Sequence, residues 1–376
     1  MTNFNRRDLL VLLAFGLALK TLLYAWAWYL TGATPLLLVQ GHDGAEYLDY
    51  ARILATAHSG QLPADIARHD PGLSAILALL WSAALKSLDL PVIALLLQTF
   101  SWIIGSLLIA RIIQLVIKTA PMPILLASTL GYPAALYYGQ FNLSEPLFMV
   151  LIFSAILASL SHRFIAAALL TGLASTVRST GLLLLGSIFL THPVIIQYFK
   201  APGQPAPKPA VPRIILIVAV GLLPWIIAQV SINYTYYTNV STYKPAFGLP
   251  FSGFQGLAQA GIARSIYMIG TVFFFILSTG MLVRQTLKYT SIPPLITVFV
   301  TVFLVFHLCL KTLYYIDTTV YTFDYQDRYL APIWPLALLA WHRYIRRSAA
   351  AALILISTVF AAWWLKNYIA VSGLLT

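Results

Sequence analysis

The sequence predicts an all-α polytopic transmembrane helix bundle of about 11 spans. Of the 376 residues, 60% are hydrophobic and only 9% are charged, whereas a soluble domain is about 25% charged. The mean hydropathy is +0.84. The apolar residues also gather in segments close to the ~20 residues that a helix needs to cross a bilayer. Together these observations exclude a large soluble domain.

The apolar segments follow one another with mostly short polar connections. They span residues 9–30, 73–88, 92–117, 122–138, 147–160, 164–177, 182–199, 214–232, 266–283, 295–316, 330–341 and 349–365. The first segment follows basic residues and lacks a small-residue cleavage site, so we interpret it as a retained span and not as a signal peptide.

Lys and Arg residues orient these segments, because cytoplasmic loops are enriched in both. The basic clusters are Arg6/Arg7, Arg111/Lys118, Arg163, Lys200/Lys208/Arg213, Arg284/Lys288 and Arg343/Arg346/Arg347. All of them lie on the cytoplasmic side if residues 73–88 do not cross. As a helix this segment is only ~24 Å long, less than the ~30 Å hydrocarbon core. We therefore predict an in-plane or re-entrant helix there.

We expect a single transmembrane domain over residues 1–376. Its parts outside the bilayer are a long first luminal or periplasmic loop (31–72) with in-plane amphipathic helices, a Pro-rich cytoplasmic linker (200–213) and a further luminal or periplasmic loop (233–265). The net charge of +12 comes from basic residues scattered at helix ends, which argues against nucleic-acid binding. Compact loops and the lack of a retention signal favour the bacterial plasma membrane over the endoplasmic reticulum.

The carboxylates are distributed asymmetrically. Of the 11 acidic residues, only Asp8 and Asp89 fall outside the predicted luminal or periplasmic segments. The others are Asp43, Glu46, Asp49, Asp65, Asp70, Glu145, Asp317, Asp324 and Asp327. One interpretation is that these loops keep acids for solubility. The other is a functional site at this membrane face, favoured by Glu145, which lies at the mouth of two apolar helices.

Asp43 is the main candidate for chemistry. It precedes the segment Gly-Ala-Glu-Tyr-Leu-Asp-Tyr-Ala, which predicts an amphipathic surface helix with Tyr47 on its apolar stripe and Glu46, Asp49 and Tyr50 on its polar face. A carboxylate held near the bilayer can act as a general base if burial raises its pKa. The alternative is that Asp43 only caps this helix.

Two His-Asp pairs, His42-Asp43 and His69-Asp70, lie in the first loop. Imidazole and carboxylate are metal ligands, but no third anchored ligand is evident, so the two pairs are only a weak indication of a metal site. Asp70 has a second interpretation, because Pro71 follows it and suits the first turn of a helix.

Several cations interrupt apolar sequence near predicted helix ends. Arg178 is costly in such a place and suggests either phosphate binding or a side chain that reaches the headgroups. Lys20, within the first span, either pairs inside the bundle or contacts a phosphate. Lys311 and Arg328 lie where a lipid phosphate would sit, and Asp327 alternatively neutralises Arg328.

Four ordered motifs carry a family resemblance. They are Asp43 with its following helix, Ser144-Glu145-Pro-Leu-Phe, Val177-Arg178-Ser-Thr-Gly181, and Asp327-Arg328-Tyr329-Leu-x-Pro332-x-x-Pro335. In this order they resemble the GT-C superfamily of polytopic glycosyltransferases that use lipid-linked sugars. The similarity is to PIG-V-type mannosyltransferases and to the protein O-mannosyltransferase and aminoarabinose transferase families.

The resemblance implies inverting transfer of a sugar, which is mannose in the PIG-V-type case, from a polyprenyl-phosphate donor to a hydroxyl of a lipid, glycan or protein acceptor. Asp43 would be the general base and Glu145 would assist it or orient the acceptor. Arg178, Arg328 or Lys311 would stabilise the leaving phosphate. The remaining expected substrate-binding residues are His42, Glu46, Tyr47, His69, Asp70 and Asp327. Neither a cofactor nor a divalent metal is expected.

Two other classes of function compete with this interpretation. A transporter or lipid flippase would also carry ionisable residues in its spans, but no internal repeat is evident and only Lys20 lies deep. A non-catalytic membrane scaffold would not need acidic residues on one face.

Overall fold

The protein is a bundle of helices, described by a computed structural model for residues 6–56, 69–84, 87–117, 122–200, 210–236, 246–247, 262–289, 292–311 and 326–372. The predicted all-α class is confirmed in these residues, where the strands β1 (Ala246–Phe247) and β2 (Leu310–Lys311) are only two residues each. Most of the linker 200–213 and of the loop 233–265, and part of the first loop, lie outside the described residues.

Five helices are long and apolar enough to cross a membrane, as expected for an integral membrane protein. They are α1 (Arg6–Thr31), α6 (Leu90–Ile117), α13 (Ala210–Tyr236), α14 (Ile262–Arg284) and α18 (Arg347–Ser372). Large apolar side chains on their outer faces are exposed, for example Leu22 at 65% and Leu355 at 65%. Because water does not favour such surfaces, these faces suit contact with lipid chains.

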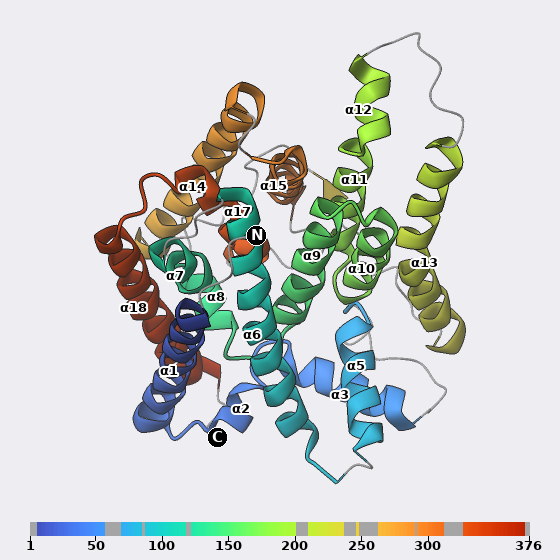
Figure 1. The fold of residues 1–376 in the computed structure, drawn as a ribbon. Coiled ribbons are helices and arrows are strands. Elements are labelled where there is room, and N and C mark those ends of the chain that lie inside the picture. The colour runs from blue at the N-terminus through green and yellow to red at the C-terminus, as the bar shows by residue number, and fades with distance from the viewer. Residues whose placement is uncertain are drawn as a thin grey trace.

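Shorter helices fill the bundle between the long ones (Figure 1). The sequence-predicted segments correspond to α9 (Ser144–Leu160), α10 (Phe164–Val177) and α15 (Pro294–Cys309). Helix α10 packs closely against α13, where a Cβ atom on Gly172 would lie 2.4 Å from the Gly221 carbonyl oxygen. Glycine is therefore required at this helix crossing.

Three predicted segments are not continuous helices, because proline interrupts them. Residues 122–138 form α7 (Met122–Leu130) and α8 (Pro133–Tyr138), and residues 182–199 form α11 (Leu182–Leu190) and α12 (Pro193–Lys200). Residues 330–341 continue α16 (Gln326–Leu330) through 3-10 turns on either side of α17 (Trp334–Leu338). Proline lacks a backbone N–H and restricts the residue before it, so each helix ends near a proline.

The first loop contributes α2 (Pro35–Leu38), α3 (Gly44–Thr56) and α5 (Gly72–Ala83), which lie together at one end of the bundle (Figure 1). Helix α3 buries Tyr47, Leu48 and Ala51, as its predicted apolar stripe requires. The prediction for Tyr50 was wrong: it is 0% exposed, because α3 packs into the bundle end as well as along α5. Helix α5 is about 18 Å long, too short for a ~30 Å core.

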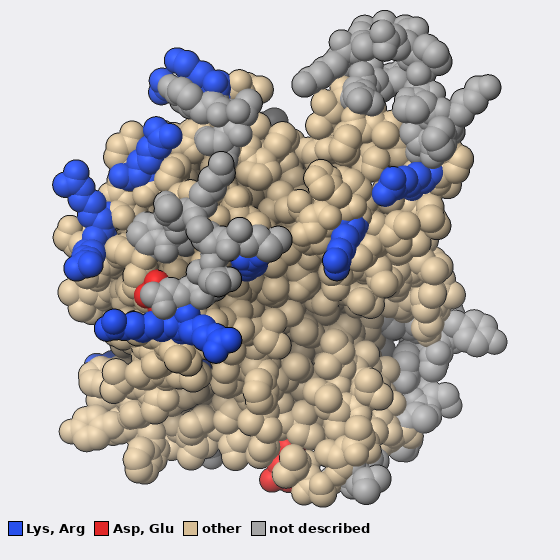
Figure 2. All heavy atoms as spheres, viewed as in Figure 1, with Lys and Arg blue, Asp and Glu red and all other residues tan. Residues whose placement is uncertain are grey.

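Charge is distributed unevenly over the surface. On the face drawn in Figure 2, most Lys and Arg side chains lie in the upper half, away from α2, α3 and α5. This separation agrees with the sequence pattern, in which basic and acidic residues alternate between the ends of successive helices.

Candidate functional site

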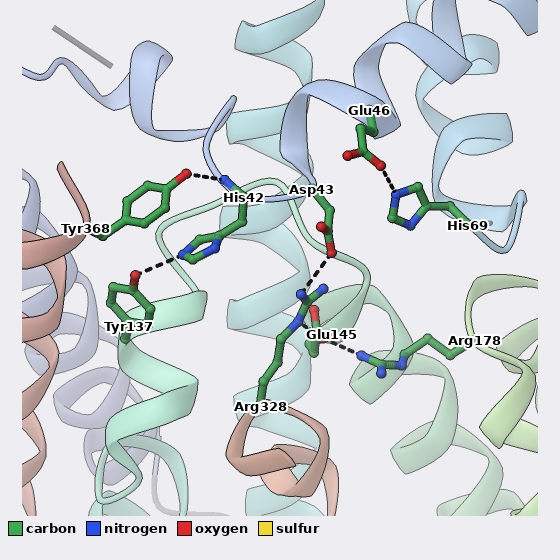
Figure 3. Close-up of polar contacts among 9 residues, drawn as sticks. All are labelled: His42, Asp43, Glu46, His69, Tyr137, Glu145, Arg178, Arg328 and Tyr368. Atoms are coloured by element: carbon green, nitrogen blue, oxygen red, sulfur yellow. Dashed lines mark hydrogen bonds and ion pairs between the residues drawn. The ribbon is translucent and has the colours of Figure 1, made fainter. Parts of the chain in front are cut away.

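Charged residues from four distant parts of the chain meet beside α3 (Figure 3). Asp43 ends the turn that precedes α3, and its carbonyl oxygen accepts the first helical hydrogen bond from Tyr47 N at 3.1 Å. Its carboxylate oxygen Oδ2 accepts a hydrogen bond from Arg328 Nη1 at 3.0 Å. The Asp43 side chain is 30% exposed, whereas that of Arg328 is 4% exposed. The buried Arg328 therefore fixes the position of the Asp43 carboxylate, which remains accessible at the protein surface.

Glu145, in the first turn of α9, bridges two guanidinium groups. Its Oε1 atom accepts hydrogen bonds from Arg328 Nε and from Arg178 Nη1, which follows the C-terminal end of α10. The Glu145 side chain is only 6% exposed. Opposite charges in hydrogen-bond contact favour the ionised form of each partner, so Glu145 serves as a buried counter-ion for both arginines. The result is a continuous chain from Asp43 through Arg328 and Glu145 to Arg178.

Aromatic rings enclose the two arginines. The Arg178 Cζ atom lies 4.5 Å from the centre of the Tyr329 ring, and the Arg328 Cζ atom lies 5.5 Å from the centre of the Tyr138 ring. Aromatic faces attract cations electrostatically, so these rings help to hold the guanidinium planes in place. Of the two tyrosines, only Tyr329 belongs to one of the four sequence motifs, the one that begins at Asp327.

Backbone contacts explain why Glu145 lies next to Asp43. The turn before α9 is tied to the first loop, because Asn142 N donates to the Val39 carbonyl oxygen at 3.2 Å. The same turn is tied to α6, because Gln98 Nε2 donates to the Leu143 carbonyl oxygen at 2.8 Å. Gln98 and Asn142 are both buried. Sequence reasoning missed their positioning role, although a buried amide in an apolar helix such as α6 is a signal for it.

His42, which directly precedes Asp43, is surrounded by aromatic side chains. Its backbone has a φ of 51°, in the left-handed region that few residues other than glycine adopt. Its N–H donates to Tyr368 Oη at 2.5 Å, and its Nε2 atom shares a hydrogen bond of 2.8 Å with Tyr137 Oη. The imidazole also stacks on Tyr368, with ring centres 4.0 Å apart. These contacts offset the backbone strain and set the direction in which the next residue, Asp43, points.

A second group of polar side chains lies within the first loop. Glu46 hydrogen-bonds to His69 Nε2, and the His69 ring packs on Tyr47 with ring centres 4.5 Å apart. One ligand atom each from Asp43, Glu46 and His69 lies within 4.8 Å of the others. Two carboxylates and an imidazole are suitable ligands for a divalent cation, so this set is where the described residues can hold a metal. Glu46, three residues after Asp43, is the third ligand that the two His-Asp pairs lacked in the sequence.

Asp70 has a structural partner. Both of its carboxylate oxygens accept hydrogen bonds at 2.7 Å, one from Ser179 N and one from Ser179 Oγ. Burial raises the pKa of the Asp70 carboxyl, and the hydrogen bonds from Ser179 oppose that shift. Because Ser179 directly follows Arg178, this contact joins the first loop to the end of α10 and helps to place the Arg178 guanidinium.

Lys20 does not belong to the charged cluster. Its Nζ atom donates to the Gly139 carbonyl oxygen at 3.0 Å, at the C-terminal end of α8. A cation at this helix end is favourable because the last carbonyl groups of a helix are unsatisfied. Of the two interpretations offered for Lys20, this contact agrees with pairing inside the bundle, where the partner is a backbone carbonyl group. Lys311 lies in β2 and Asp327 in α16, but their side chains lie outside the described residues.

A small cavity of ≈ 50 Å³ opens between α6, α7, α8, α9 and α17, with Glu145 and Arg328 at its edge. Apolar side chains such as Trp102 and Trp334 line most of it, together with hydroxyl groups of Ser101, Ser106, Ser128 and Thr129. Glu145 Oε2 is buried and has no hydrogen-bond partner within the described part of the chain. A cavity of this volume holds a few water molecules, and these can solvate that oxygen.

Comparison with protein-family models, curated proteins and solved structures finds no match for this chain.

Proposed function

We propose that the protein is a membrane glycosyltransferase that moves a sugar, such as mannose, from a polyprenyl-phosphate donor to an acceptor hydroxyl. The observation that carries this proposal is the chain of contacts from the partly exposed Asp43 to two arginines that share the buried Glu145. It combines a carboxylate that is 30% exposed with two arginines, of which Arg178, at 14% exposed, is more accessible to a phosphate than Arg328, at 4%.

In the proposed reaction, Asp43 takes the proton of the acceptor hydroxyl. The acceptor oxygen then forms a bond to the anomeric carbon, and the bond from that carbon to the phosphate oxygen breaks. The electron pair of the broken bond leaves on the lipid phosphate. Attack opposite to the leaving group inverts the anomeric configuration. Each step uses only the donor, the acceptor and side chains of this chain.

The arginines suit the stabilisation of the leaving phosphate. Guanidinium groups bind phosphate oxygens through paired N–H donors. Arg178 gives one N–H to Glu145, and its other donors have no partner among the described residues. A cation held by protein contacts before the reaction stabilises developing charge without reorganisation. Arg178 is therefore the first candidate for the phosphate contact, and Glu145 positions it.

While no donor is bound, the Arg328 guanidinium is paired with both Asp43 and Glu145. A donor phosphate beside Arg328 would offset this positive charge. His42, Glu46, Tyr47 and His69 would line the acceptor side of Asp43.

The apolar cavity beside Glu145 supports an isoprenoid donor. It extends from Arg328 and Glu145 into the bundle between α6 and α9, and its lining is mostly apolar. Its volume of ≈ 50 Å³ is far too small for an isoprenoid chain, so donor binding requires these helices to separate. The acceptor would be the hydroxyl of a lipid, glycan or protein, and no metal cofactor is proposed.

The proposed topology has about 11 spans and places this site on the luminal or periplasmic face, with a bacterial plasma membrane as the expected location. Helix α18 supports it. Arg347 begins α18 and Tyr368 near its other end holds His42, so about 32 Å of helix separates a basic cluster from the site. That length spans the ~30 Å hydrocarbon core.

Cysteine labelling tests the topology. In a Cys309→Ser background, Asp49→Cys and Arg343→Cys each place one thiol at an exposed position. In sealed, right-side-out vesicles, an impermeant reagent is expected to label Asp49→Cys and to reach Arg343→Cys only after the membrane is opened. Labelling of both from the same side would refute the proposed topology.

A transfer assay tests the reaction. The purified chain, reconstituted in liposomes, is incubated with radiolabelled polyprenyl-phosphate sugars and a panel of hydroxyl acceptors. Wild type and the control Asp49→Asn should transfer the sugar equally, because Asp49 pairs with exposed Arg52 away from the arginine cluster. Asp43→Asn should lose transfer by about a hundredfold or more, the usual contribution of a general base. Equal transfer by Asp43→Asn and wild type would reject the role of Asp43.

The transporter alternative predicts a different result in the same liposomes. Its sequence support was the deep Lys20, and the contact of Lys20 with the Gly139 carbonyl oxygen accounts for that residue without a transport path. Movement of labelled lipid across the bilayer, without any transferred sugar, would favour the transporter reading over glycosyl transfer.

A further inference from the structure

A large groove lies on the side of the bundle where α1, α7 and α18 meet. Its volume is ≈ 530 Å³, about ten times that of the cavity beside Glu145. Its walls are apolar side chains, including Phe15, Leu19, Leu126 and Ile354. Two of the three helices, α1 and α18, are among those long and apolar enough to cross a membrane. The groove therefore opens where lipid chains, and not water, surround the protein.

The groove has the length of one membrane leaflet. Along α18 its lining runs from Arg347 to Thr358, which is about 17 Å of helix. Half of a ~30 Å hydrocarbon core is about 15 Å. One acyl chain that lies along α18 therefore fills the groove from the membrane surface to near the bilayer centre.

One end of the groove is positively charged. Arg347 is the charged residue of its lining, it is exposed, and it makes no ion pair in the described part of the chain. Arg343 and Arg346 precede it and are also exposed. Basic residues at the mouth of an apolar pocket between transmembrane helices are typical of sites for anionic lipid headgroups.

We propose that this groove binds an anionic phospholipid, with one acyl chain between α1, α7 and α18 and its phosphate on the Arg347 guanidinium. The site lies in the leaflet opposite to the candidate functional site, because Tyr368, at the other end of α18, contacts His42. This position favours a membrane phospholipid over a polyprenyl-phosphate donor, whose phosphate could not reach Asp43 from there. The inference does not depend on the proposed transfer reaction.

Lipid binding here also links three helices. The groove is lined by α7, which is followed by the helix that carries Tyr137, and by α18, which carries Tyr368, and both tyrosines contact His42. An acyl chain that fills the groove restores packing contacts that an unfilled groove lacks. Bound phospholipid is therefore expected to raise the melting temperature of the protein.

The test uses the purified, delipidated full chain in detergent and four variants. Arg347→Gln removes the headgroup contact, and Arg343→Gln removes a nearby exposed charge outside the groove. Ala351→Trp fills the groove, and Ala352→Trp adds the same bulk at an exposed position of α18 that does not line it. Native mass spectrometry measures binding of phosphatidylglycerol, phosphatidylcholine and undecaprenyl phosphate. The melting temperature of each variant without added lipid serves as the folding control.

Wild type should bind phosphatidylglycerol more tightly than phosphatidylcholine, with a matching rise in melting temperature. Arg347→Gln should weaken phosphatidylglycerol binding roughly fivefold, the usual effect of one basic residue at a membrane surface, and Arg343→Gln should weaken it less. Ala351→Trp should abolish binding, whereas Ala352→Trp should not. Equal effects of the two arginine variants, or of the two tryptophan variants, would overturn the proposal. So would preferential binding of undecaprenyl phosphate that Ala351→Trp abolishes.

Discussion

Replacement of Glu145 by glutamine tests whether the buried carboxylate holds the two arginines together. The Glu145 side chain is 6% exposed, and its Oε1 atom accepts one hydrogen bond each from Arg178 and Arg328. Loss of one partner from a buried ion pair costs about 3–5 kcal/mol, because the remaining charge stays buried. Glutamine keeps the shape and one acceptor oxygen, and Arg328 keeps Asp43. We therefore expect Glu145→Gln to lower the free energy of unfolding by about 3 kcal/mol.

The matched control is Asp49→Asn. Asp49 also pairs with an arginine, but its side chain is 53% exposed and that of Arg52 is 48% exposed. Exposed ion pairs contribute at most about 1 kcal/mol, so Asp49→Asn should change stability by less than that. Unfolding is followed by tryptophan fluorescence during titration with sodium dodecyl sulfate in mixed micelles, since the chain contains 9 Trp.

A double variant distinguishes the interaction between Glu145 and Arg178 from other effects of each substitution on stability. If Glu145 acts through Arg178, then Glu145→Gln combined with Arg178→Gln should destabilise the protein by less than the sum of the two single variants, by about 0.5–3 kcal/mol. Additive effects, or a Glu145→Gln variant as stable as Asp49→Asn, would show that the two arginines do not depend on this carboxylate.

Three further predictions concern other parts of the molecule. Gly172→Ala should destabilise the bundle by about 1–3 kcal/mol through overpacking, whereas Gly186→Ala, with open space around it, should stabilise α11 by up to about 1 kcal/mol in the same unfolding assay. Asp70→Ala should cost about 1–3 kcal/mol and Ser179→Ala about half as much, because they remove two hydrogen bonds and one. Treatment with EDTA should leave sugar transfer unchanged; a loss that Mn²⁺ restores would assign an ion to the first-loop carboxylates.

Most helices could be predicted from the sequence because each depends on a local property. Runs of apolar residues predicted α1, α6, α9, α10 and α18 to within a few residues, except that α18 continues further to Ser372. The predicted apolar stripe of α3 was also correct, except for Tyr50. The helix breaks at Pro133 and Pro193 were missed. Proline signals both of them, but a continuous apolar run hides the change of direction when segments are chosen by hydropathy alone.

The charged candidates were found for a similar reason. A charged side chain within an apolar segment costs free energy, so Arg178 and Glu145 could be identified as candidates from the sequence. Their interaction partners could not be identified in this way. Glu145 and Arg328 are separated by 183 residues, and no local pattern predicts that pairing. The sequence correctly indicated a helix start after Asp70, since α5 begins at Gly72, but the partner of the Asp70 carboxylate, Ser179, lies 109 residues away.

The sequence by itself determined that this chain is a membrane-embedded helical protein, and it predicted that most of its acidic residues lie at one end of its helices. Both properties follow from hydropathy and charge along the chain, which do not depend on how the helices pack. Only the tertiary structure decided that Asp43, Arg328, Glu145 and Arg178 form one connected chain of contacts, and that Lys20 is not part of it. Contacts between distant segments depend on helix order and crossing geometry, and these emerge only when the whole bundle packs.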